Sequence, residues 1–170
     1  MKEKEYVDKL CKYMSRYFDV FTEVGSLDGK SRIDIVLKSN DGYSFGIEVK
    51  NVSEQKPGDF VKHAMQCRRY SLSAFKGFGK IPILMSPCIS DCSKDYLVKQ
   101  NLYRDDSNYH SKWNAFLWNF CNTGEVRKIK DGNRNYALFV FNNKIIYDFR
   151  EYEGVVNGFR SENYNAIFNK

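Results

Sequence analysis

The sequence predicts an α/β fold of the mixed α+β kind, in which helices flank a β-sheet. The first observation is residues 32–51, where apolar and polar side chains alternate with the period of two that half-buried strands show. The second is residues 3–18, whose apolar side chains recur at the three- and four-residue spacing of an amphipathic helix. The third is a helix-start sequence at residues 57–59, which is followed at residues 81–86 by a short apolar run typical of a buried strand.

The first predicted element is a helix from Glu3 to Phe18. Its apolar stripe, which should lie against the sheet, consists of Tyr6, Leu10, Tyr13 or Met14, and Tyr17. Acidic residues in the first turn are favoured by the helix macrodipole whatever else they do. A strand over Val20 to Val24 is expected next.

Residues Arg32 to Asn51, which read RIDIVLKSNDGYSFGIEVKN, form a predicted β-hairpin. Only a loop of odd length keeps the apolar faces of the two strands together, and Asn40-Asp41-Gly42 supplies one with glycine at the left-handed position. A two-residue Asp41-Gly42 turn is also a strong local signal, but it would mix apolar with charged side chains along the ladder. The three-residue loop gives the pairs Ile33–Val49, Ile35–Ile47 and Leu37–Phe45.

On the opposite face, this register places Asp34 across from Glu48, with Lys50 two residues further along. Opposed carboxylates repel unless a cation lies between them, and a hard divalent ion such as Mg²⁺ or Mn²⁺ prefers oxygen ligands. Such an ion would polarise a phosphoryl oxygen and activate a bound water, while Lys50 would orient that water or offset charge on phosphorus. The competing interpretation is a surface hairpin with solvated charges, because Glu-x-Lys occurs by chance in many chains.

The second predicted helix runs from Pro57 to about Phe75 and carries Gln66 and Tyr70 as an i,i+4 pair on one face. Basic or titratable side chains surround this pair: Lys62, His63, Arg68 and Arg69. Read without further context, Gln66 is a solvated helix residue and Tyr70 a packing aromatic. The predicted strand at residues 81–86 follows this helix.

Asp34, followed after thirteen residues by Glu48-Val49-Lys50 across a hairpin, resembles the D…(D/E)xK signature of the PD-(D/E)xK nuclease superfamily. Ile33 stands where the superfamily's name has proline. The resemblance covers residues 3–86, about half of the chain. It implies a restriction-endonuclease-like core, with a central mixed β-sheet flanked by helices in the order αβββαβ. It also implies metal-dependent hydrolysis of DNA, with Mg²⁺ (or Mn²⁺) held by the two carboxylates and the Val49 carbonyl, and with Lys50 as a catalytic residue.

The resemblance further implies a carboxylate from the first helix. Glu5 lies twenty-nine residues before Asp34, which is similar to the spacing in archaeal-type Holliday-junction resolvases, whose first helix supplies a glutamate to the metal site. Glu5 is therefore expected as a further catalytic residue and metal ligand. Glu3 and Glu23 remain alternatives for this accessory carboxylate.

The Gln66 and Tyr70 pair matches the QxxxY motif that follows the catalytic lysine in RecB-type members, where it lies beside the active site and the DNA strand. We expect this pair, together with Lys62 and Arg69, to contact the substrate. Resolvase action would need two active sites, which implies a homodimer.

The net charge of +6 is concentrated in the middle of the chain. Residues 51–130 contain 13 Lys and Arg against 7 Asp and Glu, whereas the segments on either side are balanced. A basic surface beside an acidic metal site suits a polyanionic substrate, although solubility alone could also account for it.

Several protein classes are disfavoured. The N-terminus lacks the apolar stretch of a signal peptide, and no run approaches the roughly 20 apolar residues of a membrane-spanning helix, so a cytoplasmic protein is expected. Five scattered cysteines are typical of reduced thiols. Two histidines without a Ser-His-Asp or Cys-His grouping argue against acyl-transfer chemistry, and the sequence has no Gly-rich phosphate loop of the GxxxxGK(S/T) kind.

The remaining residues complete a single domain, which we place at residues 1–150, with its core at 3–86 and peripheral elements at 90–150. The peripheral elements are a helix at 111–121 and strands at 126–130, 136–141 and 144–149. Residues 151–170 are expected to form a peripheral C-terminal tail.

The sequence therefore predicts a metal-dependent DNA nuclease of phage or mobile-element type. The first helix favours a branched-DNA or Holliday-junction endonuclease, and QxxxY favours a recombination nuclease of RecB or lambda-exonuclease type. The alternative is a non-catalytic nucleic-acid-binding or assembly module on the same fold.

Overall fold

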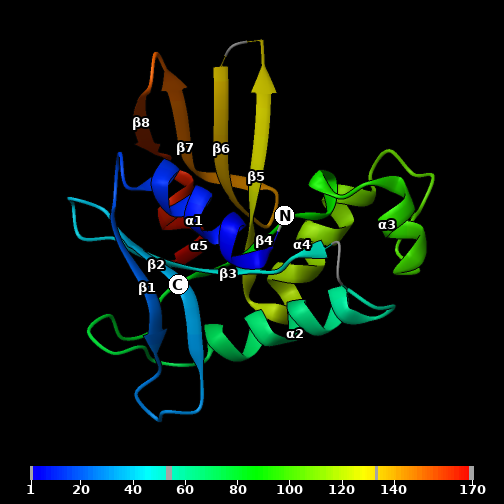
Figure 1. The fold of residues 1–170 in the computed structure, drawn as a ribbon, viewed down its shortest axis with the longest axis horizontal. Helices are drawn as coiled ribbons and strands as arrows, with labels where there is room; N and C mark the ends of the chain where they lie inside the picture. Colours follow the sequence, from blue (N-terminus) through cyan, green and yellow to red (C-terminus); the bar gives the residue numbers. More distant parts are fainter. Residues whose placement is uncertain (1, 53–54, 133, 169–170) are drawn as a thin grey trace.

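The computed structural model describes residues 2–52, 55–132 and 134–168, which form helices on both faces of one mixed eight-stranded sheet (Figure 1). The predicted mixed sheet flanked by helices is confirmed. None of the described helices is both long and apolar enough to cross a lipid bilayer. The elements are α1 (Glu3–Met14), β1 (Asp19–Gly25), β2 (Arg32–Lys38), β3 (Ser44–Val49), α2 (Asp59–Ser71), β4 (Ile83–Ser86), the 3₁₀ helix η2 (Ile89–Asp91), α3 (Lys94–Lys99), α4 (Tyr109–Cys121), β5 (Thr123–Asp131), β6 (Arg134–Phe141), β7 (Lys144–Tyr152), β8 (Val155–Arg160) and α5 (Asn163–Phe168).

The strands lie across the sheet in chain order, from β1 to β8. The pairs β3–β4 and β4–β5 are parallel, and all other neighbouring strands are antiparallel. Parallel neighbours require a crossover connection, which α2 provides between β3 and β4, and which α3 and α4 provide between β4 and β5. Helix α2 therefore follows directly on the strand that carries Glu48.

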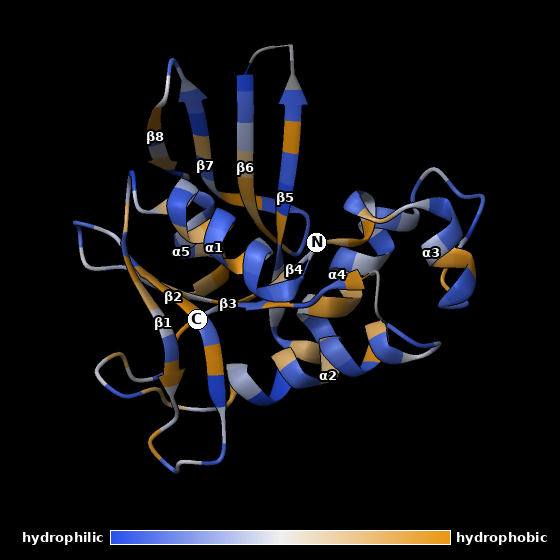
Figure 2. Cartoon of the chain, in the orientation of Figure 1, coloured by the Kyte–Doolittle hydropathy of each residue, from blue (hydrophilic) through white to orange (hydrophobic). Residues whose placement is uncertain are grey.

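Two apolar cores lie on opposite faces of the sheet. One face packs against α1 and α5, where Leu10, Met14 and Ile167 are buried. The other packs against α2 and α4, where Phe60 and Leu117 are buried. Figure 2 shows apolar residues where these helices cover the strands and mostly hydrophilic residues at the far ends of β5, β6 and β7. These ends project beyond the helices (Figure 1).

Helix α1 ends at Met14, four residues before its predicted end. The N–H groups of Tyr17 and Phe18 both donate to the Met14 carbonyl, at 3.0 and 2.8 Å, and close a final turn. Phe18 then enters the core beside Phe139, with 6.3 Å between the ring centroids. The apolar spacing continues past the helix because the residues after it face the same core.

The hairpin of β2 and β3 has the predicted register along most of its length. Ile35 pairs with Ile47, and Leu37 pairs with Phe45. The N–H of Ser39 donates to the carbonyl of Tyr43 at 2.8 Å and closes the predicted loop at residues 40–42. Gly42 has a left-handed φ of 89°, which favours glycine at this position.

The predicted pair of Ile33 with Val49 is wrong. The ladder between β2 and β3 ends at Ile35, and Ile33 packs in the core on the α2 side of the sheet. The reason is Gly46, where an added Cβ would lie 2.4 Å from the Ile33 side chain. Glycine leaves this space open, and the Ile33 side chain fills it. The alternating pattern predicts Ile33 on the same face as Ile35, but its side chain packs on the α2 face.

The predicted peripheral strands and helix are present as β5, β6, β7 and α4. Residues 151–170 differ from the expected tail: β7 continues to Tyr152, β8 pairs with β7, and α5 packs on the core with Ile167 only 4% exposed. The C-terminal segment thus completes the sheet and covers the α1 face. The boundary predicted at residue 150 falls inside β7.

Candidate active site at strands β2 and β3

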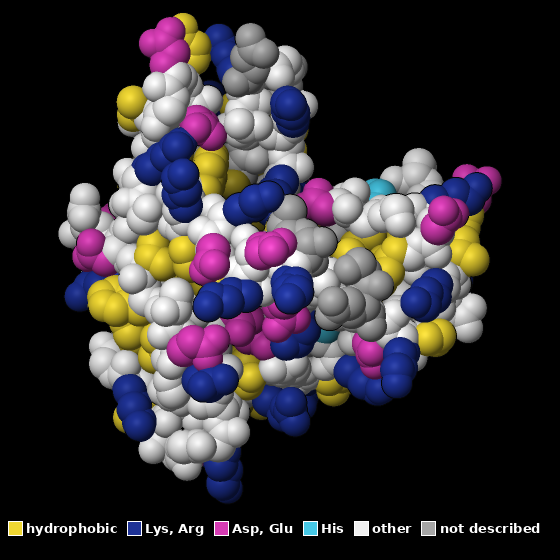
Figure 3. Space-filling view, viewed as in Figure 1, with side chains coloured by type: hydrophobic (Ala, Val, Ile, Leu, Met, Phe, Trp, Pro, Cys, Tyr) yellow, Lys and Arg dark blue, Asp and Glu magenta, His cyan; other side chains and the backbone are white. Residues whose placement is uncertain are grey.

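An open cleft of about 640 Å³ lies at the ends of β2 and β3, between the start of α1 and helix α2; we call it the active-site cleft. Its walls are charged or polar and include Glu3, Glu23, Asp34, Glu48, Lys50, Gln66 and Tyr70. Figure 3 shows Asp and Glu side chains gathered near the centre of this face, with Lys and Arg around them. The structure therefore brings the three motif residues and the QxxxY pair into one cavity.

Glu48 is the most buried charged residue of this cleft, with 1% of its surface exposed. Its Oε1 accepts hydrogen bonds from Lys50 Nζ at 3.1 Å and from Gln66 Nε2 at 2.6 Å. Its Oε2 is buried and has no hydrogen-bond partner in the described part of the chain. Burying an unpartnered carboxylate oxygen is costly, so this atom is a ready ligand position for a cation.

Asp34 lies close to Glu48, and its Oδ2 accepts a hydrogen bond from the Val49 backbone N–H at 2.8 Å. This contact replaces the backbone pairing that ended at Ile35 and holds the Asp34 carboxylate at the end of β3. Burial raises the pKa of Asp34, although the Val49 N–H and Lys50 act against this rise. Burial and the charge of Asp34 raise the pKa of Glu48 to about 8.

Lys50 is the cation that the protein itself places among these carboxylates. Burial alone would lower the pKa of Lys50, but the charges of Glu48, Glu3 and Asp34 outweigh that effect and raise it. The ammonium group therefore stays protonated. It bonds Oε1 of Glu48, so Oε2 keeps no hydrogen-bond partner within the part of the chain that the structure describes. One cation does not neutralise two or three neighbouring carboxylates, so the cleft is suited to a second positive charge.

Helix α2 orients the QxxxY pair toward the cleft. Gln66 Nε2 donates to Tyr70 Oη at 2.7 Å as well as to Glu48. One turn earlier, His63 is 2% exposed and its Nε2 lies 3.3 Å from the Glu48 backbone carbonyl. Burial and the charge of Lys50 lower the pKa of His63 to about 3, so this histidine is neutral and fixes the backbone of β3.

The sequence interpretation assigned no such role to His63. The available signal was its position three residues before Gln66, which places both on the same helix face.

The structure does not bring Glu5 into the cleft. Glu5 is exposed, and its Oε2 accepts the backbone N–H of Lys2 at 3.1 Å, which is a helix-capping contact. The alternatives Glu3 and Glu23 both line the cleft. Glu3 also accepts the Asn51 backbone N–H at 3.2 Å, which ties α1 to the end of β3. Glu3 and Glu23, and not Glu5, are thus placed to act as accessory carboxylates.

Lys62 and Arg69 line a separate recess of about 300 Å³, the α2 recess, which shares Lys50 and Gln66 with the active-site cleft. Lys62 forms an exposed ion pair with Asp59 at 3.0 Å. The predicted substrate-binding lysine and arginine are therefore beside the cleft, on the outer surface of α2.

The donor set fits a magnesium-like ion. No group of three or more His, Cys, Asp or Glu that could hold a metal is present in residues 2–52, 55–132 and 134–168. Mg²⁺ keeps several waters and is commonly bound by only one or two carboxylates. Glu48 Oε2, which has no hydrogen-bond partner among the described residues, and the neighbouring Asp34 meet that requirement. The described residues that line the cleft include no zinc-like set of nitrogen and sulfur ligands.

Neither a family model, nor a curated protein, nor a solved structure matches this chain.

Proposed function

We propose that the protein is a Mg²⁺- or Mn²⁺-dependent deoxyribonuclease of the PD-(D/E)xK type. The observation that carries this proposal is the environment of Glu48. Its carboxylate is buried beside Asp34 in the lining of an open, polar cleft. One oxygen is hydrogen-bonded by Lys50 and Gln66, and the other has no hydrogen-bond partner among the described residues. A merely solvated surface hairpin would not bury this charge or direct three other functional side chains to it.

The order of the elements supports the restriction-endonuclease-like core within this proposal. From α1 to β4 the chain runs helix, three strands, helix and strand, which is the αβββαβ order implied by the resemblance. The motif residues lie on the second and third of these strands. The charged cleft opens where these two strands separate.

Asp34 and Glu48, with the Val49 carbonyl and with Glu3 or Glu23 as accessory group, would hold the metal ion. When bound, the ion supplies Lewis acidity and lowers the pKa of a coordinated water. The protonated Lys50 offsets the negative charge that develops on the phosphoryl group. Gln66 and His63 fix the side chain and the backbone of Glu48, respectively.

The substrate within this proposal is DNA, in double-stranded or branched form. Lys62 and Arg69 in the α2 recess would neutralise phosphates next to the scissile bond. A homodimer would place two such clefts on the two strands of a junction. A cytoplasmic location is proposed with this role.

The proposal is tested by incubating the protein with supercoiled, linear, single-stranded and four-way-junction DNA in Mg²⁺, Mn²⁺ or EDTA. We expect metal-dependent cleavage that is lost in Asp34→Ala and Lys50→Ala. Asp105→Ala and Lys144→Ala serve as matched controls, because both residues are exposed and lie outside the cleft. Binding without cleavage in every condition would favour the non-catalytic module, and equal cleavage by all variants would exclude the proposed centre.

A further inference from the structure

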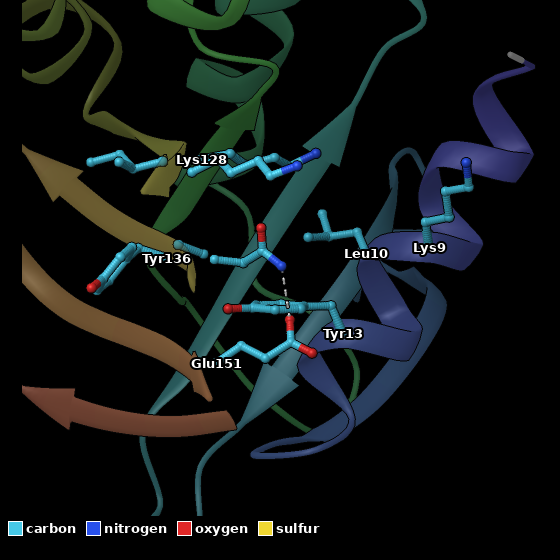
Figure 4. A pocket seen from close by; sticks show the side chains of 10 residues that line it. Lys9, Leu10, Tyr13, Lys128, Tyr136 and Glu151 are labelled. Carbon is cyan, nitrogen blue, oxygen red and sulfur yellow. Dashed lines mark hydrogen bonds between the residues drawn. The ribbon is translucent and has the colours of Figure 1, made fainter. Parts of the chain in front are cut away.

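One face of the strands β5, β6, β7 and β8 is largely exposed, whereas α1 packs against the other face. Figure 4 shows Leu10 and Tyr13 of α1 on one side of these strands, with Tyr136 of β6 pointing away from both. The strands also project beyond the helices (Figure 1). We call the side on which Tyr136 lies the β5–β8 platform; its side chains include Ile129, Arg134, Tyr136, Arg150, Tyr152 and Phe159. The proposed phosphodiester hydrolysis uses none of them.

The strand pairing arranges the aromatic side chains of the platform in neighbouring rows. Tyr136 pairs with Arg150, which puts both in one row across the strands. Tyr152 lies two residues beyond Arg150 on β7 and therefore in the next row on one side. Phe159 pairs with Asp148, two residues before Arg150, and therefore lies in the next row on the other side. Three strands thus contribute aromatic rings to one continuous surface.

The large side chains of the platform are accessible to a ligand. Tyr152 is 60% exposed, Phe159 57% and Ile129 46%. On the α1 side of the same strands, Phe139 and Phe149 are fully buried. A group of exposed apolar and aromatic side chains is uncommon on the surface of a monomeric protein and indicates a binding surface.

Arginine side chains lie beside the aromatic rings. The central carbon of the Arg150 guanidinium is 5.9 Å from the centres of both the Tyr136 and the Phe159 rings. That of Arg134 is 5.8 Å from the centre of the Tyr152 ring. A guanidinium at such a distance is attracted to the ring and offers a second flat, charged group next to it. Each of the three rings therefore has a cation at its side.

The charge that this face presents to solvent is positive. The side chain of Arg150 is 61% exposed, whereas its ion-pair partner Asp148 is 23% exposed. Arg127, further along the same face, is 26% exposed, and its partner Glu125 is 1% exposed. Arg134 is exposed as well. A polyanion complements this surface, whereas a second copy of the chain would place arginines against arginines.

We infer that the β5–β8 platform binds single-stranded DNA, with unpaired bases against Tyr136, Tyr152 and Phe159 and with phosphates at Arg134 and Arg150. Aromatic rings accept the face of any base, and rings combined with basic groups are the means by which single strands are bound without sequence preference. A blunt duplex keeps its base faces stacked on one another and offers the rings no such contact. The choice of DNA over RNA rests on the proposed function, and the binding of a single strand does not.

The platform is a surface of its own. Its exposed aromatic and arginine side chains are absent from the residues that line the active-site cleft and the α2 recess. Binding at the platform is therefore expected without a metal ion and without Glu48 or Lys50. This independence allows the platform to be tested in EDTA, where the proposed hydrolysis does not proceed.

The test is fluorescence anisotropy in EDTA with a labelled single-stranded oligonucleotide and a blunt duplex of the same sequence. Phe159→Ala is expected to weaken single-strand binding at least about fivefold and duplex binding less than about twofold, because one base loses its stacking partner. Phe159→Tyr keeps the ring and should bind like the native protein. Phe120→Ala is the matched control, because Phe120 is 67% exposed on α4, outside the platform. Unchanged single-strand binding by Phe159→Ala, or an equal loss in Phe120→Ala, would overturn the inference.

A second pair of variants tests the phosphate contacts. Arg134→Ala should reduce the slope of log affinity against log salt by about 0.7 for the single strand, the value for one phosphate contact. Arg104→Ala removes an exposed arginine that follows α3 and should leave the slope unchanged. Equal slopes in the two variants would overturn the assignment of phosphates to the platform. Binding of RNA of the same sequence more than about tenfold tighter than DNA would overturn the choice of DNA.

The remaining outcomes separate this inference from the proposed function. Single-strand binding that depends on Phe159, without cleavage in any metal, supports the platform and overturns the nuclease. Metal-dependent cleavage with native single-strand binding by Phe159→Ala supports the nuclease and overturns the platform. Self-association of the native protein that Phe159→Ala abolishes in analytical ultracentrifugation would show that a second copy covers the platform, and would overturn the inference.

Discussion

Replacing Glu48 by glutamine should remove most of the pH dependence of stability that the metal-free protein shows above neutrality. Burial and the charge of Asp34 raise the pKa of Glu48 from 4.5 in the unfolded chain to about 8 in the folded protein. Between these values the folded state binds more protons than the unfolded state. The free energy of unfolding therefore falls as the pH rises through this window.

The useful range is from about pH 6.5 to pH 8, because most of the opposite contribution of His63 lies below it. Burial lowers the pKa of His63 from 6.5 to about 3, so His63 gives a gain in stability with rising pH, of which only about 0.4 kcal/mol remains above pH 6.5. One pKa unit corresponds to about 1.4 kcal/mol, and the plot of unfolding free energy against pH flattens near the folded pKa. Between about pH 6.5 and pH 8, the titration of Glu48 therefore lowers the free energy of unfolding by about 1.5 to 2 kcal/mol. At about 2 to 4 °C per kcal/mol for a chain of this length, Tm should fall by roughly 3 to 8 °C.

The assay is differential scanning fluorimetry in EDTA across this pH range, with Glu48→Gln and with Glu5→Gln as the matched control. Glu5 is an exposed glutamate outside the cleft, so Glu5→Gln should retain the native slope. Glu48→Gln should show a flatter slope and a higher Tm at pH 8. Mg²⁺ should flatten the native slope as well, because it replaces the proton on the carboxylate. A native slope that persists in Glu48→Gln would refute the reasoning.

Three further predictions follow from the geometry. Gln66→Leu removes the 2.6 Å hydrogen bond to the buried carboxylate and should lower Mg²⁺ affinity or cleavage rate about 10- to 100-fold, as measured by metal titration of the cleavage rate. Glu3→Gln should raise the Mg²⁺ concentration needed for half-maximal cleavage, and Glu5→Gln should not, because Glu3 lines the cleft and Glu5 does not. A higher Mg²⁺ requirement for Glu5→Gln but not for Glu3→Gln would instead support Glu5, the residue predicted from the sequence, as the accessory carboxylate. Gly46→Ala should destabilise the protein by about 1 to 3 kcal/mol in urea unfolding, because the added Cβ would lie 2.4 Å from the Ile33 side chain. Adding Ile33→Val to this variant should recover part of the lost stability. Native stability of Gly46→Ala would contradict the packing described around Gly46.

The hairpin register could be predicted because two independent signals agreed. The alternation on each strand and the glycine of the Asn40-Asp41-Gly42 loop select the same pairing, and Ile35 and Ile47 pair as expected. The position of Ile33 could not be predicted, because it depends on the space above Gly46 and on Ile83, which comes from a strand far along the chain. Local alternation carries no information on such a contact.

The accessory carboxylate was uncertain for a similar reason. Glu3 and Glu5 lie two residues apart on one helix and point in different directions, so the rotation of α1 about its axis decides which one enters the cleft. That rotation is fixed by the core contacts of Leu10 and Met14, and Glu3 is the one that faces Asn51. Spacing along the sequence does not determine this rotation.

The C-terminal strand and helix were missed because their residues carry weak local signals. Val155 and Phe159 of β8 are exposed, and the strand is defined by its pairing with β7. Helix α5 spans six residues and is held by Ile167 in the core. Both elements depend on a surface that the rest of the fold must first provide.

The central claim is that Asp34, Glu48 and Lys50 form one metal-dependent centre for phosphodiester hydrolysis. Its most direct test is the single-turnover cleavage rate of a DNA substrate in Mg²⁺ for the native protein and for Lys50→Ala, with Lys144→Ala as the control for lost charge. We predict a decrease of at least about 100-fold for Lys50→Ala with DNA affinity retained, and a native rate for Lys144→Ala. Native cleavage by Lys50→Ala, or cleavage that persists in EDTA, would contradict the claim.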